Sequence, residues 1–398
     1  MSVIISKEKL DKWANYLINH SINGVTKEDV VMIKGEAICW PLISALQERI
    51  IKAGAIVDIN IVAPDNERGK VWGAAMAKYG TKEQINKVPR WQYERYNAMT
   101  KFIEVLGVSA PENFEGTNQE LAQEIMRVDA PIKNIRLSKN WVITLFPTEA
   151  FAKIEGMTLE EYADVIVEAS TVDPAQLDII EEDLYQLMGK TKTVKIVTEN
   201  PKTGNELVLT GNIEGRNIIK CTGTRNFPDG EVYASPDART LEGEIFVDLP
   251  VFQLGATIQG IYLKFNEGKI VNYSAEVGEE TLKKIIETDE GSRRIGEIAF
   301  GMNNGIKKVL KHPLFVEKVG GTLHIAIGAS YATSFVDNPN TEEGKKLLEE
   351  YIASGEMNKS AQHVDIVTDF REGGVGKAVY LDDVKLEIEN GIWKVPNK

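Results

Sequence analysis

Hydrophobic and polar positions in the first half of the chain follow two alternating patterns. Short apolar runs at residues 30–33 and 55–62 predict buried strands, and the helical spacing at 41–52 predicts a helix between them. Two strands joined by a helix form a βαβ unit, which is typical of parallel sheets covered on both faces. Helical spacing over residues 92–106 and a strand-like run at 141–146 continue this pattern.

The pattern changes near Gly189. Alternating runs at residues 193–197 and 207–210 flank a connection rich in turn residues, which is typical of a hairpin, and further strand-like runs follow. We therefore predict an α/β N-terminal scaffold domain with a parallel sheet over residues 1–190. A β-rich α+β domain, which would carry the metal and the catalysis, is expected over residues 191–398.

Composition narrows the classes of protein that fit. The 398 residues carry a formal charge of -13, and such an acidic chain is not expected to bind nucleic acid or an anionic membrane. Cys39 and Cys221 lie far apart, which argues against a disulfide framework or a cysteine-ligated zinc. Residues 1–21 have the spacing of an amphipathic helix and not that of a signal peptide, and no apolar run is long enough to span a bilayer. A cytoplasmic location is expected.

The turn after the first predicted strand is where a nucleotide-binding βαβ unit would carry its phosphate-binding glycines. Residues 34–41 lack the spaced glycines that bring a pyrophosphate to a helix N-terminus, and Glu36 would repel phosphate. The chain also contains no Walker-type phosphate loop and no G-x-S-x-G nucleophile motif. A scaffold role is favoured for the N-terminal domain.

Candidate metal ligands occur only in the second half. His324 and His363 lie in apolar, strand-like segments, and Asp365 follows His363 by two residues. On a strand, that spacing directs both side chains to the same face, where they can share one ion. The alternative for an isolated H-x-D is an exposed or hydrogen-bonded pair that binds no metal.

Two glutamates extend this set. Glu297 lies in an apolar run, where an unpaired carboxylate is costly, so a cation is expected beside it; Arg293 or Arg294 is the alternative partner. Glu231 follows a turn and has the alternative of a solvated loop residue. Three carboxylates and two imidazoles suit zinc, cobalt or manganese, and they exceed what one catalytic zinc uses. Two divalent ions are therefore plausible.

These residues fall in four ordered blocks, at positions 226–233, 293–299, 324–331 and 363–365. In their order and spacing the blocks resemble those of metallo-aminopeptidases of the aminopeptidase T and aminopeptidase S type. The stretch at residues 140–148 and a similar total length extend the resemblance over most of the chain.

The resemblance implies roles for individual residues. The implied metal ligands are Glu231, Glu297, His324, His363 and Asp365. Tyr331 matches an active-site tyrosine of the family, and Glu317 matches a further acidic residue, so the predicted catalytic residues are Tyr331, Glu297 and Glu317. For Tyr331 the alternative is a ring packed at a strand end. The resemblance also implies a homodimer.

The expected function is hydrolysis of single N-terminal residues from peptides with a free N-terminus, by water activated at two metal ions. One alternative is a dinuclear hydrolase of another amide, ester or phosphate. The other is a non-catalytic binding protein with the same fold.

Overall fold

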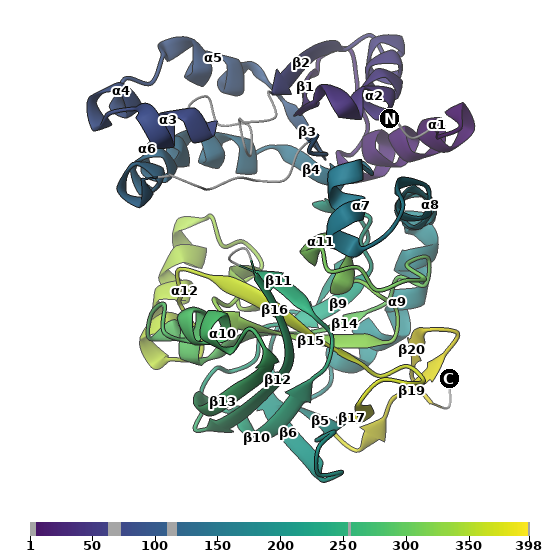
Figure 1. The fold of residues 1–398 in the computed structure, drawn as a ribbon, viewed down its shortest axis with the longest axis vertical. Helices are drawn as coiled ribbons and strands as arrows, with labels where there is room; N and C mark the ends of the chain where they lie inside the picture. The colour runs from purple at the N-terminus through teal and green to yellow at the C-terminus, as the bar shows by residue number, and fades with distance from the viewer. Residues whose placement is uncertain (1–4, 63–72, 110–117, 254–255, 397–398) are drawn as a thin grey trace. The chain divides into compact units, whose positions relative to one another are not determined.

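The computed structural model describes residues 5–62, 73–109, 118–253 and 256–396. The chain forms two compact units (Figure 1). The first contains Met1–Pro174 and Gly223–Pro228, and the second contains Ala175–Thr222 and Asp229–Lys398. The chain thus passes between the units at residue 174, sixteen residues before the predicted boundary at 190, and returns briefly to the first unit at 223–228.

The first unit is built on a parallel sheet with the order β2-β1-β3-β4-β8. Its strands are β1 (Val30–Glu36), β2 (Ile56–Val62), β3 (Lys101–Leu106), β4 (Asn140–Leu145) and β8 (Asn226–Phe227). Its helices are α1 (Lys7–Tyr16), α2 (Trp40–Lys52), α3 (Gly73–Tyr79), α4 (Lys82–Asn86), α5 (Arg90–Ala98), α6 (Gln119–Leu137), α7 (Glu149–Glu155) and α8 (Leu159–Ala169). The predicted parallel sheet and its βαβ unit are confirmed.

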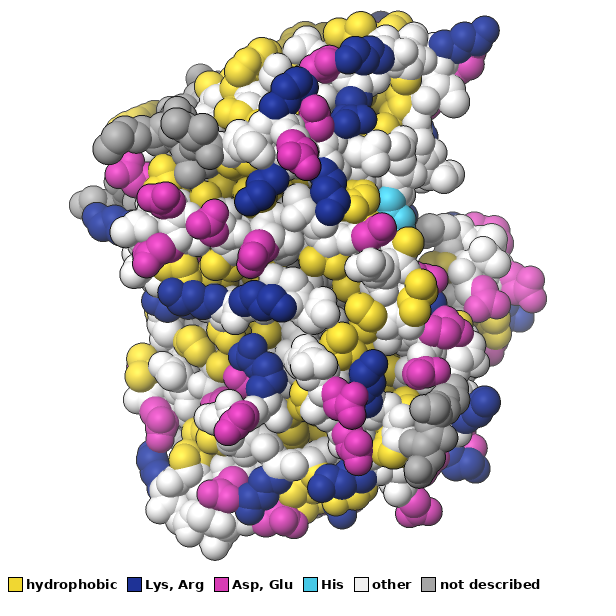
Figure 2. Space-filling model, turned by 90° about the vertical axis from the view of Figure 1, so that its right-hand side faces the viewer, with side chains coloured by type: hydrophobic (Ala, Val, Ile, Leu, Met, Phe, Trp, Pro, Cys, Tyr) yellow, Lys and Arg dark blue, Asp and Glu magenta, His cyan; other side chains and the backbone are white. Residues whose placement is uncertain are grey.

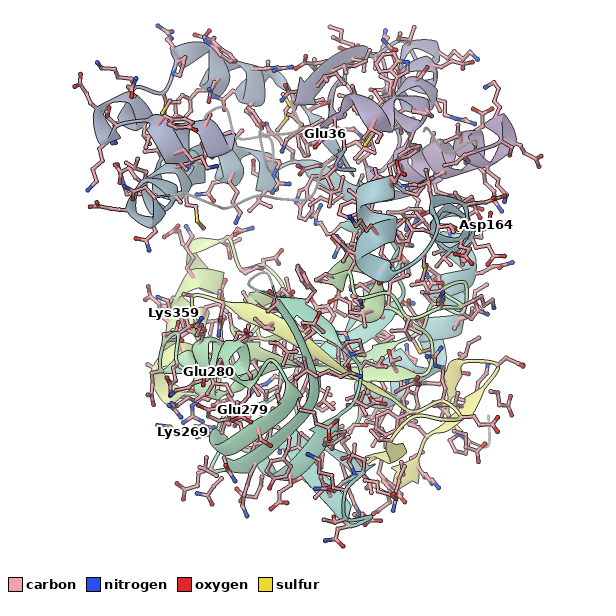
Figure 3. The ribbon with its side chains drawn as sticks, viewed as in Figure 1. Glu36, Asp164, Lys269, Glu279, Glu280 and Lys359 are labelled. Atoms are coloured by element: carbon pink, nitrogen blue, oxygen red, sulfur yellow. The ribbon has the colours of Figure 1, made fainter. Side chains whose placement is uncertain are left out.

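The predicted helix over residues 92–106 is wrong in its second half. Helix α5 ends at Ala98, and β3 begins at Lys101 between β1 and β4. Phe102 and Ile103 are fully buried there, so pairing with strands on both sides overrides the local helical spacing. Glu36, which is labelled in Figure 3, lies at the end of β1. Its carboxylate accepts hydrogen bonds from the backbone N–H and the hydroxyl of Ser109.

The second unit contains two antiparallel sheets. The larger has the path β11-β12-β10-β6-β5-β17-β18, with β13 paired to β12. Its strands are β5 (Thr193–Glu199), β6 (Glu206–Asn212), β10 (Glu242–Val247), β11 (Val251–Gln253), β12 (Ala256–Asn266), β13 (Lys269–Val277), β17 (Gly376–Leu381) and β18 (Val384–Lys385). A hairpin of β19 (Glu387–Glu389) and β20 (Ile392–Lys394) lies near the C-terminus.

The smaller sheet has the order β16-β15-β14-β9-β7. Its strands are β7 (Ile219–Cys221), β9 (Glu231–Ala234), β14 (Ile295–Gly301), β15 (Thr322–Gly328) and β16 (His363–Asp369). The helices of this unit are α9 (Pro174–Met188, whose first residue belongs to the first unit), α10 (Glu279–Ile286), α11 (Pro313–Val316) and α12 (Glu342–Ser354). Helix α10 begins with Glu279 and Glu280 (Figure 3), whose charges suit a helix N-terminus.

One hydrophobic cluster joins the two sheets of the second unit. It combines Ile245 and Ile261 of the larger sheet with Ile298, Ile325 and Ile366 of the smaller one. The sheets therefore pack face to face. This arrangement buries one face of the smaller sheet in the core and leaves its other face for polar side chains.

Charges of both signs share the surface. On the face shown in Figure 2, acidic and basic side chains are interspersed, and no extended basic patch is visible there. Within the described ranges, none of the helices combines the length and apolar character that crossing a bilayer requires.

Candidate metal centre

All five predicted metal ligands lie on one face of the smaller sheet. In the strand register, Glu231 of β9 is opposite Gly301 of β14, and Glu297 of β14 is opposite Ala326 of β15. Ala326 is in turn opposite Asp365 of β16, and His324 and His363 lie two residues from Ala326 and Asp365. Because side chains alternate along a strand, these five side chains project to the same side.

Small residues make room between the donors. Ala299 is opposite His324, and Ala326 lies between Glu297 and Asp365 in the register. Residues next to these, such as Ile298 and Ile325, point into the hydrophobic core. The alternation of apolar and polar or small residues therefore separates the core from the candidate centre.

Glu297 belongs to two donor groups and contacts both histidines. Its Oε2 atom lies 2.9 Å from Nε2 of His363 and 3.9 Å from Nε2 of His324. Two groups of donors meet at it: Glu231, Glu297 and His324, and Glu297, His363 and Asp365; in each group the candidate ligand atoms lie within 4.8 Å of one another. The carboxylate of Glu297 could therefore contribute to holding a metal ion with either group.

Glu297 does not form an ion pair with Arg293 or Arg294, the alternative partners considered from the sequence. Arg293 pairs with Glu287 at 3.9 Å, and the guanidinium of Arg294 donates to the carbonyl oxygens of Ala238 and Glu267. The ion-pair partners of Glu297 in the described part of the chain are the two histidines. The loop alternative for Glu231 fails as well, because Glu231 is buried at the start of β9.

A backbone atom orients His363. Its Nδ1 lies 2.7 Å from the carbonyl oxygen of Ala329, while Nε2 faces Glu297 and, at 3.2 Å, Oδ1 of Asp365. Such a contact on one ring nitrogen typically fixes the other as a metal ligand. Burial lowers the pKa of His363, but hydrogen bonds to Asp365 and Glu297 outweigh burial and raise it to about 11.

Two buried donor atoms lack a hydrogen-bond partner. Oε2 of Glu231 and Nδ1 of His324 have none among the described residues, and the nearest charged contact of that Oε2 is Nε2 of His324 at 3.5 Å. Leaving buried polar atoms without partners is costly, and each such atom in a folded protein calls for an explanation. Unpaired oxygen and nitrogen donors gathered on one face fit zinc, cobalt or manganese.

Glu317 lies beside this set, in the loop between α11 and β15. It falls in a third donor group with His324 and Asp365, and it shares a hydrogen bond with Asp365. Burial raises the pKa of Glu317 well above its ordinary value, although the positive charge of Lys318 opposes this effect. The structure thus brings Glu317 together with the five predicted ligands.

Two charged residues at the centre, Lys318 and Asp229, were not predicted from the sequence. Lys318 has a side chain only 2% exposed, and its Nζ lies 2.9 Å from Oε1 of Glu317 and 3.4 Å from Oδ1 of Asp229. Asp229 forms a further donor group with Cys221 and Glu231. The available signal for Lys318 was its position directly after Glu317, a predicted catalytic residue, since a buried lysine requires carboxylate partners.

Tyr331 lies three residues beyond the end of β15. Its ring centroid is 4.7 Å from that of His363 and 5.2 Å from that of Tyr233. The residue remains 42% exposed, so its ring lies at the edge of the centre against the rings of His363 and Tyr233.

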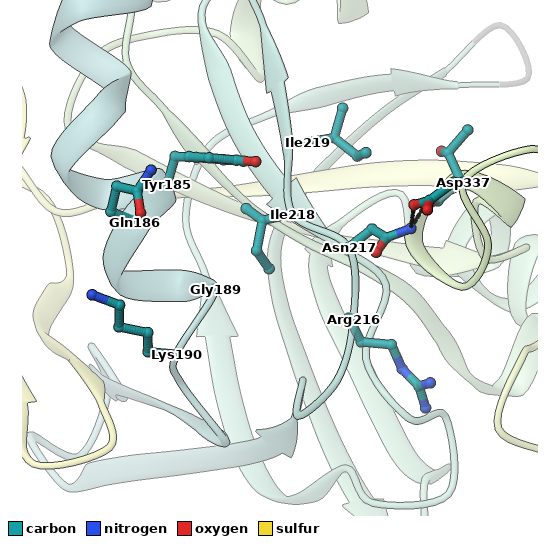
Figure 4. Close-up of a pocket in the computed structure, with 10 residues that line it drawn as sticks. Tyr185, Gln186, Gly189, Lys190, Arg216, Asn217, Ile218, Ile219 and Asp337 are labelled. Atoms are coloured by element: carbon teal, nitrogen blue, oxygen red, sulfur yellow. Dashed lines mark hydrogen bonds between the residues drawn. The ribbon is translucent and has the colours of Figure 1, made fainter.

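A separate pocket of about 520 Å³ lies elsewhere in the second unit (Figure 4). Asn217 in its lining donates to Asp337 at 2.9 Å, and Arg216 pairs with Glu356 at 2.9 Å. None of the predicted site residues lines it. The metal donors, and not this pocket, define the candidate centre.

Known proteins are similar to this chain over about half of its length or more. Aminopeptidase T from Thermus thermophilus is 27% identical over 426 residues, covering 98% of this chain and 99% of that protein. Aminopeptidase AmpS from Bacillus subtilis is 31% identical over 214 residues, or 52% of this chain and 48% of that protein.

Solved structures support the fold. Wild-type AmpT from Thermus thermophilus superposes with a TM-score of 0.72 at 22% identity, covering 98% of this chain and 100% of that one. A 2,5-dihydroxypyridine dioxygenase from Pseudomonas putida KT2440 gives 0.57 at 12% identity, with 99% of each chain covered. The family model described as thermophilic metalloprotease (M29) matches residues 6–375. This chain therefore belongs to the thermophilic metalloprotease (M29) family.

Proposed function

We propose that this chain is a metal-dependent aminopeptidase that removes single residues from peptides with a free N-terminus. The observation that carries the proposal is the sharing of Glu297 by two groups of donors, one with Glu231 and His324 and one with His363 and Asp365. Each group is the ligand set for one divalent ion. The relatives named aminopeptidase T and AmpS support peptides as the substrate class.

Two divalent ions, when bound, supply an activated water at neutral pH and polarise the peptide carbonyl. Glu317 is the candidate for holding and moving a proton between that water and the leaving amine, because both ions would occupy the shared carboxylate of Glu297. Burial raises the pKa of the Glu317 carboxyl, which moves it toward the range where proton transfer at neutral pH is efficient. The phenol of Tyr331 donates a hydrogen bond to the oxygen that gains charge on the carbonyl.

Further features belong to the same proposal. The ions are zinc, cobalt or manganese, because the donor set lacks the thiolates that softer ions prefer. Residues 191–398 supply every proposed ligand, and residues 1–190 act as the scaffold. The protein works as a homodimer in the cytoplasm, in line with the resemblance of its sequence blocks to the aminopeptidases.

A second candidate is oxygen chemistry at one non-haem iron. The observation that favours it is that Nε2 of His363 and Nε2 of His324 lie 2.9 and 3.9 Å from Oε2 of Glu297, since two histidines and one carboxylate are the ligands of many iron oxygenases. The dioxygenase of the same fold makes this reaction class worth testing. Oxygen uptake with dihydroxypyridines, in protein loaded with ferrous iron, distinguishes the two candidates.

Metal content and hydrolysis of a leucine anilide, measured on the same sample, test the first proposal. We expect activity to disappear on chelation and to return with zinc, cobalt or manganese, while phosphoesters remain intact. E297A should lose activity at least ~100-fold, whereas E206Q, a change at an exposed strand position, should not. Hydrolysis by metal-free protein, or a fully active E297A variant, overturns the proposal.

A further inference from the structure

A buried ammonium group occupies one side of the candidate metal centre. Nζ of Lys318 lies 2.5 Å from Oε1 of Glu231, in addition to its contacts with Glu317 and Asp229. Two of these three carboxylates are members of the donor groups around His324. Lys318 therefore forms ion pairs with two carboxylates, Glu231 and Glu317, that could otherwise bind a second divalent ion.

The backbone holds this lysine in place. Its N–H donates to the carbonyl oxygen of Phe315 at 3.1 Å, and its own carbonyl accepts from the N–H of Asn303 at 2.9 Å. Gly301 permits this close approach, because a Cβ there would lie 2.2 Å from the carbonyl oxygen of Val319. The segment is thus fastened to the end of β14, and the ammonium group stays beside the carboxylates.

We propose that Lys318 is a built-in cation that competes with metal for Glu231 and Glu317 and so makes the two ion positions unequal. The position formed by Glu297, His363 and Asp365 binds tightly. The position formed by Glu231, Glu297 and His324 binds weakly and exchanges its ion. This inference rests on the proposed two-metal centre and adds an assignment of which position is labile.

Charge and distance give the reason. Oε1 of Glu231 pairs with Lys318, whereas Oε2 of the same carboxylate has no hydrogen bond among the described residues and faces Nε2 of His324 at 3.5 Å. A divalent ion held by Oε2 would share one carboxylate with a fixed positive charge, and like charges repel strongly at short separation in a buried site. The ion pairs of Glu297 and Asp365 in the described part of the chain involve histidines and no lysine or arginine.

The removal of this charge tests the inference. Chelator-treated full-length protein is titrated with Co²⁺ by calorimetry, and bound cobalt is counted after gel filtration. We expect two binding steps in the wild type whose dissociation constants differ at least ~10-fold. In K318M the weaker step should tighten at least ~10-fold, with less than ~3-fold change in the tighter one. K318R keeps the charge and should retain the wild-type difference.

Two results overturn the inference: equal steps in the wild type, or a weaker step that is unchanged or further weakened in K318M. Should K318M not fold, K318Q, which is neutral and polar, takes its place in the same titration, with circular dichroism as the check on folding. Binding is measured without substrate. An absence of peptidase activity with the expected two steps therefore counts against the proposed function and leaves this inference standing.

Discussion

Nδ1 of His363 lies 2.7 Å from the carbonyl oxygen of Ala329, and Nε2 of the same ring lies 2.9 Å from Oε2 of Glu297. The imidazole is therefore held between a backbone atom just past the end of β15 and a carboxylate on β14. Because the carbonyl oxygen is part of the main chain, the direction of the ring depends on strand geometry more than on any neighbouring side chain.

Ala326 should be sensitive to added volume. It is fully buried and lies between Glu297 and Asp365 in the strand register, so the larger side chain of A326V would intrude among the donors. We expect bound metal and activity to fall at least ~10-fold with the fold retained. The matched control is I325V, which points into the core and should cost only ~0.5–1.5 kcal/mol of stability. Elemental analysis measures the bound metal of the two variants, and circular dichroism checks that each is folded. Normal metal content in A326V would contradict the prediction that added volume at this position disturbs the donors.

The phenol of Tyr331 should matter for turnover and not for metal binding. Y331F removes one hydrogen-bond donor at the edge of the centre, and we expect kcat to fall ~100-fold with metal content unchanged. Steady-state kinetics on a leucine anilide checks this. Y79F changes an exposed tyrosine of the first unit and should behave as the wild type. An unchanged kcat in Y331F would show that the ring only packs there.

Metal removal should lower thermal stability. The donors of the centre include several carboxylates that repel one another when no cation is bound. Free metal at about 100 times its dissociation constant stabilises a folded protein by ~2.7 kcal/mol, which corresponds to roughly 5–10 °C in Tm for a domain of this size. Calorimetric scans with and without chelator measure the shift. E297A should show a much smaller shift, and a wild-type Tm that is indifferent to chelator would argue against a metal centre.

Glu181 predicts a pH dependence of stability. It is fully buried in α9, and neither of its carboxyl oxygens has a hydrogen-bond partner among the described residues. Burial, followed by the charges of Asp229 and Glu231, raises its pKa to about 10, whereas an unfolded glutamate titrates near 4.3. The folded state therefore binds more protons between these values, and stability falls as pH rises through that window.

The neutral variant E181Q does not titrate and should lose less stability than the wild type between about pH 6 and about pH 9. Urea unfolding of metal-depleted protein at the two pH values measures the difference. Identical losses in both proteins would mean that Glu181 is already ionised in the folded state.

Spacing and composition singled out candidate donors, and the resemblance of the sequence blocks to a known family assigned their roles. His363 and Asp365 share a face because a strand alternates, and Glu297 stood out as a carboxylate in an apolar run. Which strands are neighbours, however, depends on pairings between distant segments. Lys318 and Asp229 meet only through those pairings. The neighbouring Glu317 indicates one partner of Lys318 in the sequence, but it does not indicate that Asp229 also lies beside the lysine.

The fold prediction failed where neighbours decide the conformation. Residues 101–106 carry helical spacing, yet they form the central strand β3, because β1 and β4 offer backbone partners on both sides. Helix α6 was not anticipated either. It contains Pro131, a residue that usually ends a helix. The start of the helix is stabilised by Asn118, whose side chain accepts hydrogen bonds from the N–H groups of Glu120 and Leu121.

The order of the ligand strands along the chain has a consequence for synthesis. Glu231 opens β9 and Asp365 lies on β16, and the strands between them pair in the finished sheet. A nascent chain still lacking β16 offers an ion only part of the donor set, so a complete centre requires that the chain through Asp365 has left the ribosome. Capture of an ion in the position that includes His363 and Asp365 therefore follows the synthesis of every strand of the smaller sheet.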